Sequence, residues 1–155
     1  MPAFHRTPRI LLRLIHLPPR LAYTFGLGPL IGKMILLLTT RGRKSGRPRV
    51  TPLQYEEIDG CYYLAAALGG RADWVRNIQA DPRVQVRVLR RCFSGRAQII
   101  RDPGRIADFL ALRLQRHPRM VAAILRSAGL SIPPSRADLE QYAVRLALVV
   151  VQPDQ

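Results

Sequence analysis

The amino-acid sequence predicts an α+β protein in which an antiparallel, barrel-like sheet has helices packed outside it. Two observations lead to this prediction: short apolar or alternating segments are joined by tight turns, and helical segments interrupt and then follow them. The expected order is β-β-β-α-β-β-α-α-β. With 155 residues, of which 48% are hydrophobic, the chain can bury one core, so we expect a single domain.

The first strands are short apolar runs that end at glycine-bearing turns. The dipeptide Asp59–Gly60 is a hairpin signal that joins the second strand to the third. A helix over 73–80 follows, and Asp81–Pro82 ends it because a residue before proline disfavours helical backbone. We expect these first three strands at residues 33–40, 50–58 and 61–68.

The second half of the chain begins with alternating valines, which predict a strand with one buried face over 84–88. Its hairpin partner is expected at 93–101, with the turn at Arg90–Cys92. Proline and glycine residues then divide three helical segments from one another before a final strand. We expect helices at 102–115 and 118–129, a short turn of helix at 135–141, and the last strand at 144–151.

The domain organisation predicted here is an N-terminal helical segment, 1–32, followed by a barrel domain, 33–155. Residues 6–20 combine leucine and isoleucine with basic residues and no acids, which leaves peripheral contact with an anionic membrane open. Cys61 and Cys92 give neither a metal-binding spacing nor a disulfide framework, so we expect no metal and a cytoplasmic location.

The formal net charge of +15 implies affinity for an anionic ligand or surface. Five of the basic residues fall between Thr40 and Arg49, with Gly42 and Gly46 among them and no acid. Glycines let a backbone approach a ligand closely, so this segment is a candidate anion-binding loop. The alternative is a hairpin tip whose charges face water.

The sole tryptophan and the sole asparagine, Trp74 and Asn77, lie three residues apart on the predicted helix. Side chains at this spacing share a helix face. They could flank a flat cofactor ring, since an indole stacks on such rings and an amide both donates and accepts hydrogen bonds. The alternative places Trp74 in the core and uses Asn77 as a cap.

Three blocks of the sequence, Leu38–Leu53, Ala66–Gly70 and Trp74–Val86, resemble the deazaflavin-dependent nitroreductase and quinone reductase family in order and spacing. The resemblance implies a split β-barrel of the flavin-reductase or FMN-binding type that binds the reduced deazaflavin coenzyme F-420. It also implies an oxidoreductase that passes a hydride to a quinone, a nitroaromatic or an activated alkene. A small-molecule electron acceptor is therefore the expected partner.

The resemblance also carries over a set of cofactor-binding residues. Lys44 and Arg49 match contacts to the phosphate and acidic tail, with Arg43 and Ser45 beside them. The chain departs from the family at Gln54, where an aromatic residue is frequent near the ring, and at Leu68. No catalytic residue is assigned, because the cofactor carries the hydride. The complete set is Arg43, Lys44, Ser45, Arg49, Thr51, Pro52, Ala66, Ala67, Trp74 and Asn77.

Other functions remain as alternatives at this point. FMN also presents a phosphate to a basic loop, and a non-catalytic protein of this fold could hold a lipid or a tetrapyrrole. We expect no nucleic-acid partner, because aromatic residues make up only 6% of the chain and single-strand platforms interleave them with basic residues. Family members often form homodimers, and the sequence itself does not decide whether this chain does.

Overall fold

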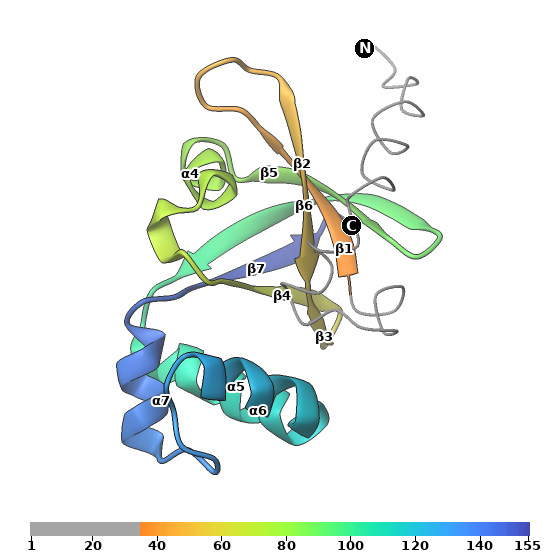
Figure 1. The fold of residues 1–155 in the computed structure, drawn as a ribbon. Helices are drawn as coiled ribbons and strands as arrows, with labels where there is room; N and C mark the ends of the chain where they lie inside the picture. The colour runs from red at the N-terminus through yellow and green to blue at the C-terminus, as the bar shows by residue number, and fades with distance from the viewer. Residues whose placement is uncertain (1–34) are drawn as a thin grey trace, which may run out of the picture. The chain divides into compact units, whose positions relative to one another are not determined.

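The computed structural model describes residues 35–155, in which seven strands and four α-helices form the barrel domain and its helical layer (Figure 1). The predicted N-terminal helical segment and its membrane contact lie outside these residues. No helix in the described part is long and apolar enough to cross a membrane. The elements are β1 Ile35–Arg41, β2 Pro48–Gln54, β3 Glu56–Ile58, β4 Cys61–Ala66, η1 Gly69–Arg71, α4 Asp73–Ala80, β5 Arg83–Val88, β6 Arg91–Ile100, α5 Pro103–Arg116, α6 Pro118–Ser127, α7 Arg136–Ala143 and β7 Ala147–Pro153.

The seven strands form one antiparallel sheet in the order β2-β1-β5-β6-β7-β4-β3. Strands β2 and β3 lie at opposite edges of this sheet, yet Tyr55 is the single residue between them in the chain. The two edges must therefore come together at Tyr55, which curls the sheet into the split barrel (Figure 1). The sequence-based prediction of an antiparallel barrel with helices outside is confirmed.

The predicted strand over 50–58 is wrong in one respect, because it is two strands that belong to different edges. Strand β2 pairs with β1 up to Gln54, whereas β3 pairs with β4 from Glu56 onward. Proline lacks the N–H that a central strand needs on both sides, and Pro52 accordingly lies in the edge strand β2. The alternating side chains continue through Tyr55, so the sequence pattern carries no sign of the change of edge.

Side chains alternate between two cores across the sheet. On β4, Tyr62 and Leu64 belong to the barrel interior, whereas Tyr63 and Ala65 pack against the helical layer. Helix α4 closes the interior with Trp74, Val75 and Ile78. Helices α5, α6 and α7 cover the other face with the cluster Ile106, Phe109, Leu110, Val121, Leu125 and Leu139.

Two further boundaries differ from the sequence-based prediction. Val88 pairs with Arg91, so the hairpin turn is Leu89–Arg90, and Cys92 lies within β6 instead of the turn. The last strand begins at Ala147 and not at 144, because α7 continues to Ala143. The remaining helices agree closely with prediction, and Asp102 caps α5 by accepting a hydrogen bond from the Arg105 amide.

A buried carboxylate, that of Glu56, joins the closing corner of the barrel to the helical layer. Arg113 donates to it from Nε at 3.3 Å, His117 Nε2 lies 2.9 Å away, and Arg116 binds its second oxygen at 3.2 Å. The side chains of Glu56 and Arg113 are 6% and 9% exposed. Burial lowers the pKa of Arg113, while Glu56 acts to raise it. The ion pair thus fixes β3 to the end of α5.

We expect Glu56→Gln to lower the free energy of unfolding by about 3 kcal/mol, because the amide leaves the buried Arg113 without a counter-charge. Urea denaturation measures this change. Glu57→Gln is the matched control, since its side chain is 45% exposed and 3.9 Å from Arg91, and should cost at most about 1 kcal/mol. Equal, small losses in the two variants would contradict the proposed role of Glu56.

Candidate functional site

The basic loop between β1 and β2 is closed by its own backbone. The amide of Gly42 donates to the carbonyl of Arg47 at 2.8 Å, and that of Gly46 donates to the carbonyl of Gly42 at 2.7 Å. Gly46 has φ of 67°, a left-handed conformation that favours glycine. A Cβ on Gly42 would lie 2.8 Å from Ser45 Oγ. The two glycines therefore serve the compact turn of the loop itself.

Arg43 and Asn77 attach this loop to helix α4. Asn77 Oδ1 accepts from the Arg43 amide at 3.2 Å and from its guanidinium at 3.0 Å, while Asn77 Nδ2 donates to Thr40 Oγ1 at 3.1 Å. Asn77 is 4% exposed and Thr40 1% exposed. Arg43 also pairs with Asp73, whose side chain is 83% exposed, so that ion pair contributes little. The buried amide is the main attachment.

The other basic side chains of the loop project into solvent. Lys44 and Arg47 in the loop, with Arg41 and Arg49 at the adjoining strand ends, are exposed, and none of them forms an ion pair within residues 35–155. Ser45 Oγ accepts a hydrogen bond from the Arg47 amide at 3.3 Å and helps to fix the turn. The loop and its strand ends thus present four unpaired cations on a hydrogen-bonded backbone, a donor set that suits an anionic group of a ligand.

The predicted site residues of β2 lie on both faces of the edge strand. Arg49 is opposite Thr40 and Thr51 is opposite Leu38, so both residues lie on the face of the sheet that carries the barrel core, although Arg49, near the end of the edge strand, is itself exposed. Pro52 is opposite Leu37 and faces outward, where it is exposed. Because β2 is an edge strand, a ligand that contacts Pro52 on one face and Arg49 or Thr51 on the other would have to pass over the edge of the sheet.

By the family resemblance, Pro52, Ala66 and Ala67 line the cofactor ring and Trp74 and Asn77 flank it, and several of these residues are buried. Trp74 is 8% exposed within the barrel core, and Ala66 is 2% exposed in the same core. Ala67 is exposed just beyond β4. The structure therefore brings Arg43, Asn77 and Thr40 together, places Trp74 behind them in the core, and leaves Lys44, Ser45, Arg49, Pro52 and Ala67 on the surface. The cofactor contacts of all these residues stay predictions.

Sequence reasoning did not find the polar group next to Gln54. Arg113 donates from a terminal nitrogen to Gln54 Oε1 at 3.1 Å, and Gln54 Nε2 lies 3.8 Å from Met120 Sδ. These three residues come from β2, α5 and α6. Nothing in the sequence distinguished Arg113 from the other arginines, because its partners are 57 and 59 positions away. In the sequence, the one indication of this polar group was Gln54, which stands where an aromatic residue is frequent in the family.

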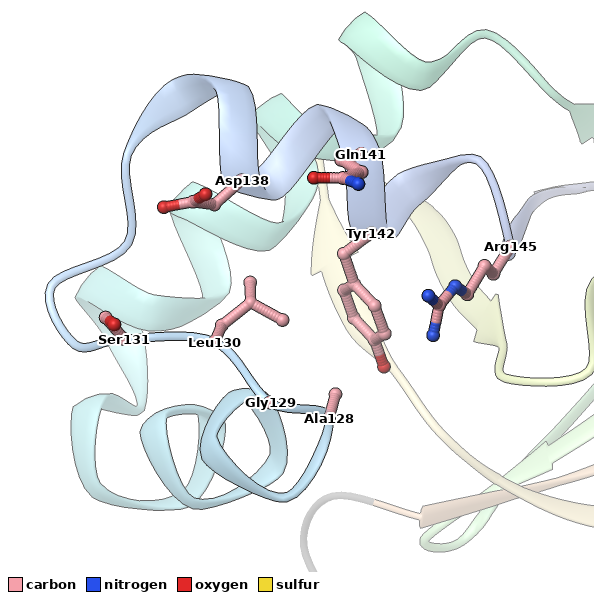
Figure 2. Close-up of a pocket in the computed structure, with 8 residues that line it drawn as sticks. All are labelled: Ala128, Gly129, Leu130, Ser131, Asp138, Gln141, Tyr142 and Arg145. Atoms are coloured by element: carbon pink, nitrogen blue, oxygen red, sulfur yellow. The ribbon is translucent and has the colours of Figure 1, made fainter.

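A separate cavity of about 240 Å³ lies between the end of α6 and α7 (Figure 2). Tyr142 and Arg145 project into it, and burial raises the pKa of Tyr142. None of the residues predicted from the sequence to bind the cofactor lines it. The lining consists of Ala128, Gly129, Leu130, Ser131, Asp138, Gln141, Tyr142 and Arg145.

The fold defines the class of split-barrel proteins, and its basic loop suits an anionic ligand. Within that class, the chain belongs to the F420H(2)-dependent quinone reductase family, whose pattern matches residues 23–122. F420H(2) is the reduced form of coenzyme F-420. The family assignment made from the three sequence blocks is confirmed.

Individual relatives agree with this assignment. The chain is 38% identical over 56 residues to the F420H(2)-dependent quinone reductase Rv1261c of Mycobacterium tuberculosis, a match that covers 34% of this chain and 38% of the relative. The match thus spans well under half the length of that curated protein. The solved structure of an F420-H2 dependent reductase, FDR-A, aligns at a TM-score of 0.53 with 24% identity, covering 77% of this chain and 95% of the other.

The fold is also shared with a protein of different description. The heme storage protein HutZ of Vibrio cholerae aligns at a TM-score of 0.54 with 18% identity, covering 90% of this chain and 91% of the other. At such identity the likeness concerns the fold alone. The split barrel by itself therefore does not select a ligand, and the family match carries more weight.

We expect Asn77→Ala to lower the free energy of unfolding by about 1–3 kcal/mol, because Thr40 and the Arg43 amide lose a buried partner. Hydrogen exchange at the Arg43 amide should accelerate, since its acceptor is removed. Gln79→Ala, at an exposed position of the same helix, is the control and should change stability by no more than about 0.5 kcal/mol. Unchanged exchange at Arg43 would show that the amide does not hold the loop.

Proposed function

We propose that this chain is a reductase that transfers a hydride from reduced F-420 to a quinone, with nitroaromatics and activated alkenes as further candidate acceptors. The observation that carries the proposal is the set of exposed cations at the loop and its strand ends, Arg41, Lys44, Arg47 and Arg49, where backbone hydrogen bonds fix the loop before any ligand binds. A preorganised cationic loop suits a cofactor with a phosphate and an acidic tail.

Each part of the site has a distinct task in this proposal. Lys44 and Arg49 bind the anionic tail, whereas Arg43 holds the loop against α4 through Asn77. Pro52, exposed on the outer face of β2, offers an apolar surface to the ring. The bound cofactor supplies the hydride, and the protein supplies binding, orientation and exclusion of water. In this proposal the reaction uses neither a metal ion nor a side chain that transfers a proton.

The alternatives differ in what the site would bind. The family and the relatives named above support F-420 and give no support to FMN. A non-catalytic lipid or tetrapyrrole carrier would keep the fold, as the likeness to HutZ illustrates, but it would not require the acidic-tail contacts. Assembly as a homodimer and a cytoplasmic location stay predictions.

We expect Lys44→Ala combined with Arg49→Ala to weaken F-420 binding by roughly 100-fold or more, because each charge-assisted hydrogen bond contributes about 1.5 to 3 kcal/mol. The fluorescence of F-420 measures the dissociation constant. Binding to the parent protein should also weaken as salt is raised, since exposed charges are screened over about 8 to 10 Å, and the double variant should lose most of this dependence.

A control for this experiment removes the same charge elsewhere. Arg105→Ala with Arg126→Ala changes two exposed arginines on the helical layer, away from the basic loop, and should leave the affinity within a few-fold. A loop variant that binds F-420 as tightly as the parent, with the same salt response, would mean that the loop merely faces water. The carrier alternative would then be preferred.

A further inference from the structure

The carboxamide of Gln54 has an orientation that its partners determine. Arg113 approaches it with a terminal nitrogen at 3.1 Å. A guanidinium has only donors, so the atom of Gln54 that faces it must be the oxygen. Arg113 cannot turn away, because its Nε is bound to Glu56 and its side chain is only 9% exposed. The buried ion pair therefore determines that Oε1 of Gln54 faces Arg113 and that Nε2 points away from it.

The NH2 group of Gln54 is consequently aimed away from Arg113. Its one hydrogen-bond partner within the described residues is the thioether sulfur of Met120, at 3.8 Å. A thioether is a weak acceptor, and the amide nitrogen carries two hydrogens. Gln54 is half-buried, so it is not enclosed in the core. The NH2 group is therefore an oriented donor that can form a further hydrogen bond.

The position of this donor relates it to the proposed ring site. Gln54 is the last residue of β2, and side chains two apart on a strand share a face, so Gln54 lies on the same outward face as Pro52. Met120 of α6 borders it on the side of the helical layer. An exposed proline, a thioether and a fixed N–H donor together suit a flat, mostly apolar ring that carries an oxygen.

We propose that Gln54 donates a hydrogen bond from Nε2 to a ring carbonyl oxygen of the ligand at this site, with its amide oriented by Arg113. This inference rests on the proposed function. Both the deazaflavin ring and a quinone carry such oxygens, so the shared chemistry is the ring carbonyl. This chain thus offers a directed hydrogen bond at a position where an aromatic residue is frequent in the family.

Gln54→Glu tests the donor separately from any structural role. The variant keeps the size of the side chain and its contact with Arg113, which becomes an ion pair, but it removes both N–H groups. The melting temperature should therefore stay the same or rise, whereas ring binding should weaken by about tenfold or more. Gln98→Glu, exposed on β6, adds the same charge as a control and should bind as the parent does.

Two binding measurements identify which ring carries the oxygen. The fluorescence of oxidised F-420 gives its dissociation constant, and calorimetric titration of menadione into the F-420-bound protein gives that of a quinone. A tenfold loss in the first places the carbonyl on the cofactor, and a loss in the second alone places it on the acceptor; either result supports the proposal. Gln54→Met, which has a similar length and no donor, should give the same loss if the glutamate variant does not fold.

Gln54 variants that bind both ligands as tightly as the parent would overturn this inference and leave the proposed function intact. A parent protein that does not bind F-420 at all would overturn both together.

Discussion

The ion pair between Glu56 and Arg113 is the constraint on which the two halves of the domain depend. Glu56 is the first residue of β3, directly after the point where the chain changes from one edge of the sheet to the other. A buried carboxylate without cations would be strongly destabilising, so the helical layer must place Arg113, Arg116 and His117 around it. The closing corner of the barrel and the docked ends of α5 and α6 thus share one ion-pair cluster.

The same constraint reaches the candidate site at two places. At the corner where the barrel closes, Arg113 is held by Glu56 and donates a hydrogen bond from a second nitrogen to Gln54, which orients the Gln54 amide. At the far end of β1, an uncharged attachment takes the place of an ion pair: the buried amide of Asn77 bonds to Thr40 and to the Arg43 amide and holds the basic loop against α4. Strand β2 runs between these two fixed ends, so a cofactor along this edge would meet a surface arranged before binding.

Much of the fold could be predicted from the sequence, because periodicity and turn residues are local signals. The valines of β5, the hairpin at Asp59 and the cap at Asp102 each depend on a few neighbouring residues. The change of sheet edge at Tyr55 could not be predicted, since both edges have the same alternation. The role of Arg113 could not be predicted either, because buried and exposed arginines are identical in a sequence and only partners 57 and 59 positions away distinguish this one.

The distribution of acids explains why the loop is so strongly cationic in the folded chain. The ten acidic residues all fall within the described part, and six of them form ion pairs, with Asp102 and Asp138 capping helices. None lies between 40 and 49, and among the ion pairs of the described residues the one that includes a residue of this segment joins Asp73 to Arg43. Of the five basic residues in this segment, the fold pairs only Arg43, which has a structural task. Arg41, Lys44, Arg47 and Arg49 form no ion pair within the described residues and create a positive potential, which is the electrostatic condition for binding an anionic ligand.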